Sequence, residues 1–216
     1  MTLSPLSEEN IKTWRRLQVQ DYFAYARDEN GELTDRVGLG NKLVGDYDFT
    51  GKTGFVIGCG YGRELSWLLA KGASFVLGID VSREVLRIAH DWMFSQNWGI
   101  PDDYDLAEWN QLDGLVGYIN PFDFSYCFTV FQHVTQEIVR YYIDLSGKLI
   151  KPGGRVFHQF FCNEGDEVGE VELSTNEEPH HSGYTRGQLE RWYSKAGFEV
   201  DVEPLSPYYF VRAIKL

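Results

Sequence analysis

A glycine-rich turn after an apolar run constrains the fold of this chain more than any other feature. The run Gly54–Ile57 is typical of a buried strand, and directly after it glycine occupies positions 58, 60 and 62. Glycine allows positive φ angles and lets a ligand approach the backbone where a Cβ would collide with it. A second apolar run, Phe75–Ile79, ends in Asp80, whose carboxylate can accept hydrogen bonds from ribose hydroxyls. Together these features predict a nucleotide pocket.

Strand-like and helix-like segments alternate after residue 50, a pattern typical of an α/β fold. Only Leu205-Ser206-Pro207 separates the last two strand-like segments, which is too short for a helical crossover, so these two should pair antiparallel. We predict a seven-stranded, mostly parallel sheet with helices on both faces and a C-terminal antiparallel hairpin. The expected strands are Gly54–Gly58, Phe75–Asp80, Asp105–Trp109, Phe122–Phe128, Arg155–Phe161, Phe198–Pro204 and Tyr208–Lys215.

Capping signals predict where helices begin and end. Ser82 and Thr135 stand at expected N-caps, and Thr185 with Gln188 has the spacing of a capping box. The turn Lys151-Pro152-Gly153-Gly154 is expected to stop one helix and lead into the fifth strand.

Composition limits the classes of partner. A chain of 216 residues is most simply one domain, and 20 basic against 32 acidic residues give a net charge of -12. An acidic surface repels phosphate backbones, so we expect a small-molecule partner and no nucleic acid. The 3 cysteines lack metal-site spacing, so we expect no metal. The chain does not start with basic residues followed by an apolar stretch, and it has no long apolar run. These two features predict a cytoplasmic protein that binds no membrane.

The glycine spacing separates two kinds of nucleotide pocket. A dinucleotide fingerprint would place its third glycine at position 63, where this chain has Arg63. The stretch Ile57-Gly58-Cys59-Gly60-Tyr61-Gly62-Arg63 instead resembles the first motif of the class I S-adenosylmethionine-dependent methyltransferases. The resemblance implies that Gly58, Cys59 and Gly60 wrap the methionine part of the cofactor. It also implies that Asp80 binds the ribose.

The same resemblance suggests further cofactor contacts. Arg63 would pair with the methionine carboxylate, unless it simply faces solvent at the start of a helix. Val81 would lie against the adenine, and Asn110 and Gln111 would contact its amino group, with Asp113 as an alternative.

One departure from the family concerns the methionine amine. Many relatives carry an acid two residues before the first glycine, and this chain has Val56 there. We expect the backbone carbonyl near Phe128 to replace that acid, with Glu64 as a second possibility.

The resemblance also bears on chemistry and substrate. The segment Phe131-Gln132-His133 resembles one found in small-molecule methyltransferases, and it follows the fourth expected strand, where open α/β sheets bind ligands. His133 is therefore a candidate general base, or else a histidine that holds the loop. Expected substrate contacts are His158, His181 and Tyr184, near an acidic stretch that is either a substrate rim or a solvated loop.

The amino terminus precedes the expected sheet. Ile11, Trp14, Arg15, Leu17 and Gln18 recur at helical spacing. In the methyltransferases such a helical cap covers the cofactor, so we expect residues 1–50 to form a cap on a core of residues 51–216. Helices packed on the edge of the sheet are the simpler alternative.

The leading hypothesis is a methyltransferase that carries a methyl group from S-adenosylmethionine to a hydroxyl or an amine of a small molecule. Two alternatives remain at this point. One is a nicotinamide-dependent oxidoreductase on a similar fold, which Arg63 disfavours. The other is a methyltransferase-like partner subunit without turnover, for which Val56 is a hint.

Overall fold

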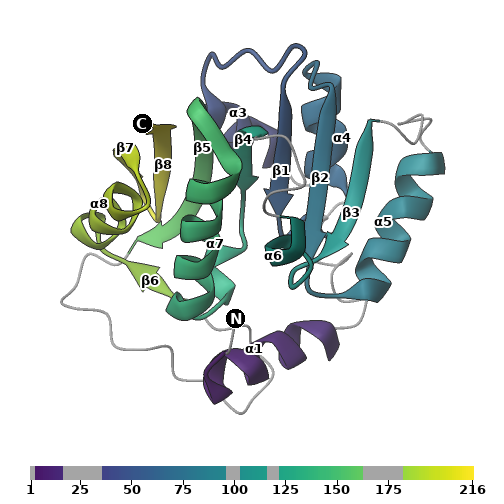
Figure 1. Cartoon of the computed structure of the whole chain (residues 1–216), viewed down its shortest axis with the longest axis horizontal. Coiled ribbons are helices and arrows are strands. Elements are labelled where there is room, and N and C mark those ends of the chain that lie inside the picture. The colour runs from purple at the N-terminus through teal and green to yellow at the C-terminus, as the bar shows by residue number, and fades with distance from the viewer. Residues whose placement is uncertain (1–2, 17–35, 96–102, 116–121, 163–181) are drawn as a thin grey trace.

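The chain forms one mixed sheet with helices on both faces (Figure 1). The computed structural model describes residues 3–16, 36–95, 103–115, 122–162 and 182–216. The strand order is β3-β2-β1-β4-β5-β8-β7, and β6 pairs with β5. The strands are β1 Thr53–Ile57, β2 Phe75–Asp80, β3 Tyr104–Glu108, β4 Phe122–Cys127, β5 Ile150–Cys162, β6 Gly183–Tyr184, β7 Phe198–Leu205 and β8 Tyr208–Lys215.

This arrangement confirms the predicted α/β class, because only β8 pairs antiparallel with its two neighbours and closes the terminal hairpin. The sheet has eight strands rather than the seven predicted. The extra one is β6, whose two residues pair with the end of β5. Two residues are too few to produce the alternation by which a strand is found in a sequence.

The turn between α7 and β5 also differs from the prediction. β5 begins at Ile150, directly after the helix, and its pairing with β4 shifts register between Phe122 and Phe124. The segment Lys151–Gly154 is therefore an irregularity within β5 rather than a loop before it. Gly153 has a φ of 79°, a conformation that favours glycine, so the sequence signal was real and its structural meaning was misread.

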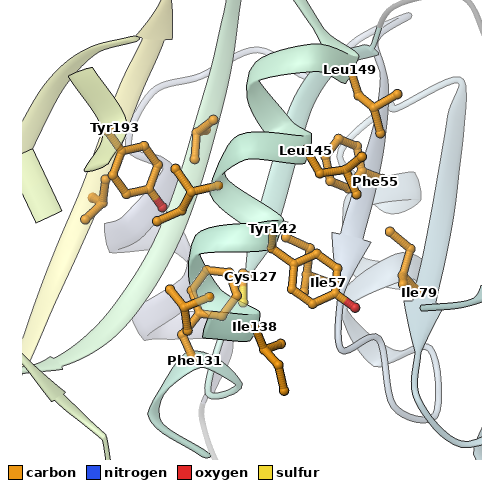
Figure 2. Close-up of a cluster of buried hydrophobic side chains, with 14 of the residues drawn as sticks. Phe55, Ile57, Ile79, Cys127, Phe131, Ile138, Tyr142, Leu145, Leu149 and Tyr193 are labelled. Carbon is orange, nitrogen blue, oxygen red and sulfur yellow. The ribbon is translucent and has the colours of Figure 1, made fainter. Parts of the chain in front are cut away.

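Two buried clusters, one on each face, hold the helices against the sheet. The face of α7 and α8 is shown in Figure 2, where Tyr142, Leu145 and Leu149 of α7 lie over Phe55 and Ile57 of β1. The opposite face holds α3, α4 and α5. The helices are α1 Pro5–Arg16, α3 Arg36–Val44, α4 Arg63–Ala70, α5 Arg83–Ser95, α6 Leu112–Leu115, α7 Gln136–Leu149 and α8 Arg186–Lys195, with a 3-10 turn, η1, at Phe131–His133. No helix in the described part of the chain is both long and apolar enough to cross a bilayer.

Two of the three predicted caps are confirmed. Ser82 Oγ accepts a hydrogen bond from the Val85 N–H at 3.4 Å, and Thr185 Oγ1 accepts one from the Gln188 N–H at 3.3 Å. Thr135 stands at the N-cap of α7, but its side chain makes no capping bond and lies 2.7 Å from the hydroxyl of Ser7. The expected cap at this position is therefore replaced by a contact with α1.

Parallel pairing brings the motifs to one end of the sheet. Ile57, the last residue of β1, is level with Ile79 in β2 and Cys127 in β4, and Cys127 is level with His158 in β5. The segments that follow β1, β2 and β4 therefore leave the sheet side by side at the carboxyl ends of these strands.

Candidate functional site

The glycine turn and Asp80 form one hydrogen-bonded unit. Gly58, Gly60 and Gly62 have φ angles of 66°, 51° and 84°. The Gly60 N–H donates to Asp80 Oδ2 at 3.1 Å, and the Ser82 N–H donates to Asp80 Oδ1 at 3.0 Å. The carboxylate thus ties the turn after β1 to the end of β2. Each of its oxygens has a second lone pair, which can accept a ribose hydroxyl.

Asp80 stays partly accessible in this unit. Burial raises the pKa of its carboxyl group, and the backbone N–H groups of Ser82, Gly60 and Val81 oppose that rise. A half-buried acid whose charge is held by backbone donors suits the recognition of uncharged hydroxyls.

Helix α4 begins at the same turn. Gly62 is its N-cap and no side chain caps it, so N–H groups of the first turn are open to an anion. Arg63 donates to Glu64 Oε1 at 3.0 Å, and the two side chains are 26% and 16% exposed. Arg63, which was expected to face either the cofactor or solvent, is thus paired with Glu64. Glu64, the second candidate for the methionine amine, therefore already has a cationic partner.

Helix α1 lies across the carboxyl ends of the parallel strands (Figure 1). Arg15 Nε donates to the Val81 carbonyl at 2.9 Å, next to Asp80. Trp14 Nε1 and Asn10 Nδ2 donate to the His133 carbonyl at 2.9 and 3.1 Å. One helix thus bridges the end of β2 and the segment after β4. Leu17 and Gln18 lie outside the described residues.

His133 sits under this helix. Its ring lies 5.2 Å from the Trp14 ring between centroids, and its Nε2 is 3.1 Å from Nε2 of Gln132. Because an amide nitrogen only donates, this contact needs an unprotonated His133 Nε2. A rotated Gln132 amide would accept from Nε2–H instead, so the tautomer of His133 follows the orientation of Gln132.

The arrangement is compatible with an aminoacyl nucleoside. Three positive-φ glycines shape the turn, an uncapped helix starts at the same turn, and Asp80 stands at the tip of the next strand. A family model described as "Methyltransferase domain" matches residues 24–203. This chain belongs to that methyltransferase family. Its cofactor is S-adenosylmethionine.

Solved structures with the same fold include several methyltransferases. A phosphoethanolamine N-methyltransferase from Haemonchus contortus, solved with S-adenosyl-L-methionine, aligns at a TM-score of 0.69 and 16% identity over 99% of this chain and 60% of that one. The cyclase SpnF aligns at 0.66 and 17% identity over 82% and 80% of the two chains. An O-methyltransferase family protein from Burkholderia thailandensis aligns at 0.65 and 15% identity over 83% and 55%. No curated protein matches the chain.

Two expected substrate contacts of the methyltransferase prove to be core residues. His158 is fully buried, with Nε2 2.9 Å from Ser125 Oγ and Nδ1 2.6 Å from Tyr193 Oη. Tyr184 is also fully buried, and its hydroxyl donates to the Phe131 carbonyl at 2.9 Å. Neither side chain presents surface to an acceptor, because both point into the packed face under α8. The third expected contact, His181, lies outside the described residues.

The expected adenine contacts remain predictions. Val81 packs against the buried cluster on the α7 face of the methyltransferase. Asn110 and Gln111 are exposed, and Gln111 Oε1 accepts a hydrogen bond from the Glu108 N–H at 2.8 Å. Trp109, which was not predicted as a contact, packs against the same buried cluster as Val81, with its ring 6.4 Å from that of Tyr141. The side chain of Asp113 is outside the described part. Among the described side chains, no three His, Cys, Asp or Glu groups gather in a way that could hold a metal.

Gly58 allows a direct test of the turn. A Cβ built on it would lie 2.3 Å from Val130 Cγ2, and valine is too stiff to move aside without cost. Gly58→Ala should therefore destabilise the methyltransferase by about 2–4 kcal/mol, from overpacking together with the positive φ. Urea unfolding measures this change. Gly45→Ala is the matched control, because Gly45 has a φ of 58° with nothing within 4 Å of a built Cβ. Equal losses in the two variants would show that Val130 does not restrict position 58.

Proposed function

We propose that the protein transfers the methyl group of S-adenosylmethionine to a hydroxyl or an amine of a small-molecule acceptor. The observation that supports this proposal most directly is the place of His133. It follows β4, whose neighbour β1 leads into the glycine turn, and α1 covers it. A titratable imidazole at the carboxyl end of the sheet, beneath helix α1, suits proton transfer.

The bound cofactor supplies an electrophilic methyl group on a good leaving group, so the residues mainly have to align the reactants. Asp80 would hold the ribose, and the glycine turn and the start of α4 would hold the amino-acid end. Positioning of this kind can lower a barrier by about 7–11 kcal/mol. His133 would take the proton that the acceptor oxygen or nitrogen loses as its bond to carbon forms.

The class of acceptor is supported by charge and by the matched structures. A chain with a net charge of -12 repels polyanions, which favours a small molecule over a nucleic acid. The Haemonchus protein is named as an N-methyltransferase and the Burkholderia protein as an O-methyltransferase family protein, so both acceptor atoms occur on this fold. We keep as predictions a cytoplasmic location and the division into a cap, residues 1–50, and a core, residues 51–216.

His133→Ala tests the assignment of the base. We expect turnover to fall by at least about a hundredfold, which is the usual contribution of a general base. Binding of S-adenosylhomocysteine should stay within about threefold, because the hydrogen bonds from Asn10 and Trp14 end on the backbone carbonyl of residue 133, which alanine keeps. Turnover is read as S-adenosylhomocysteine release with a panel of small hydroxyl and amine acceptors, and binding by calorimetry. Unchanged turnover in the variant would remove His133 from the chemistry.

A second candidate function is a partner subunit that binds the cofactor without turnover. Val56 favours it, because this residue is buried and apolar where many relatives carry an acid. Wild-type protein that binds S-adenosylhomocysteine but methylates nothing, alone or in a cell extract, would favour this second candidate. The family match favours both candidates over a nicotinamide-dependent oxidoreductase.

A further inference from the structure

Thr129 adopts an unusual backbone conformation directly after β4. Its φ is 60°, and it is the one non-glycine residue with a positive φ among the described residues. A threonine is strained there, because its branched side chain crowds the backbone in the left-handed region. Something must hold this conformation, and such strain tends to collect at functional sites.

The residue that holds it is Gln159. The Thr129 N–H donates to Gln159 Oε1 at 2.8 Å, and the Gln159 side chain comes from β5, the neighbour of β4. This bond also fixes the orientation of the amide, because only the oxygen can accept. Gln159 is 1% exposed, and its Nε2 is buried without a partner in the described part of the chain. Burying an amide nitrogen without a partner costs stability, and an apolar side chain would avoid this cost. The hydrogen bond to Thr129 is therefore what the glutamine contributes at this position.

Holding the Thr129 N–H also orients the preceding carbonyl. In a trans peptide the carbonyl of one residue and the N–H of the next point in opposite directions. Since the Thr129 N–H points to a side chain of β5, the Phe128 carbonyl points to the other side of β4, where β1 lies. The glycine turn stands there, and a Cβ on Gly58 would touch Val130. The carbonyl therefore faces the turn expected to hold the amino-acid end of the cofactor.

An acceptor is needed at this place because the usual acid is absent. Val56 is apolar and 1% exposed, and Glu64 is paired with Arg63. Of the two groups that could bind the cofactor's ammonium, Glu64 already has a cationic partner, which leaves the Phe128 carbonyl. We propose that Gln159 is a positioning residue for cofactor recognition: it holds Thr129 so that the Phe128 carbonyl accepts a hydrogen bond from the ammonium group. This inference deepens the function proposed above and rests on it.

Two ligands separate this role from a structural one. S-adenosylhomocysteine carries the ammonium group, whereas 5′-methylthioadenosine keeps the adenine, ribose and thioether and lacks the amino-acid chain. Calorimetry on Gln159→Leu should show about tenfold weaker binding of S-adenosylhomocysteine, the effect of losing one hydrogen bond to a charged group. Binding of 5′-methylthioadenosine should stay within about twofold. Unchanged binding of the first ligand, or equal losses for both, would overturn the proposal.

Further variants keep the test decisive. Gln159→Met, which fills the same space with a flexible apolar chain, serves with the same expectation if the leucine variant does not fold. Ser125→Ala removes another buried polar group, from the middle of β4, and should change neither affinity. The double variant Gln159→Leu/Thr129→Gly should bind S-adenosylhomocysteine about threefold more tightly than Gln159→Leu alone, because glycine adopts a positive φ without strain. No recovery would contradict the proposed route through Thr129. Wild-type protein that binds neither ligand would overturn the cofactor assignment itself, and this inference with it.

Discussion

Asp80→Ala is expected to weaken the binding of S-adenosylhomocysteine by about a hundredfold. The carboxylate accepts hydrogen bonds from the Gly60 and Ser82 N–H groups, and we expect it to accept ribose hydroxyls as well. The alanine variant loses the ribose contacts, each worth about 1.5–3 kcal/mol with a charged acceptor. It also releases the glycine turn from the end of β2. Isothermal titration calorimetry measures the change in affinity.

Asp91→Ala is the control for this experiment. Asp91 is an acid on α5 with a side chain that is 64% exposed and paired with Arg87. Its removal changes the net charge by the same amount and should leave affinity within about twofold, because exposed ion pairs contribute little. An Asp80→Ala protein that folds and binds with wild-type affinity would show that the ribose lies elsewhere, and the site described above would have to be abandoned.

Stability is expected to fall by about 2 kcal/mol between about pH 7 and about pH 5 because of His158 alone. Burial lowers the pKa of His158 from 6.5 to about 3, so the folded protein keeps this imidazole neutral. The unfolded chain binds a proton as the pH drops through 6.5, whereas the folded chain does so only near 3. Protons therefore favour the unfolded state throughout this window, and the stability that is present at neutral pH is lost on acidification.

Urea unfolding at several pH values measures this loss, and two variants assign it. His158→Gln is less stable at neutral pH, because it disturbs the contacts with Ser125 and Tyr193, but its stability should change less from about pH 7 to about pH 5. His90→Gln removes a histidine whose side chain is 64% exposed. In this control the free energy of unfolding should fall with pH as much as it does in the wild type. A slope that is the same in all three proteins would show that His158 is not the group responsible.

The sequence predicted best what depends on local chemistry. The glycine turn, the acid at the tip of β2 and the terminal hairpin each follow from a few neighbouring residues, and the structure has them where they were expected. The strand β6 and the bulge in β5 were missed because they depend on pairing with a distant strand. Thr135 shows the same limit, since its hydroxyl contacts Ser7 of a helix far away in the sequence.

The site residues divide in the same way. His158 and Tyr184 stand near the carboxyl end of a strand, but alternation along β5 and the packing of α8 turn them into the core. A polar residue in a strand gives no local sign of the face that it occupies when both faces are covered. Gln159, next to His158, was not selected for the same reason. Its importance becomes visible only with the conformation of Thr129, which no propensity of threonine predicts.

The attachment of α1 has a consequence for how such a site can diversify. The hydrogen bonds from Asn10, Trp14 and Arg15 all end on main-chain oxygens, those of residues 81 and 133. Main-chain oxygens persist whatever side chain is present. We therefore expect that Val81, the proposed adenine contact, and His133, the proposed base, can each be replaced while those three bonds remain. Selection could then alter the reaction chemistry without rebuilding the cover over it.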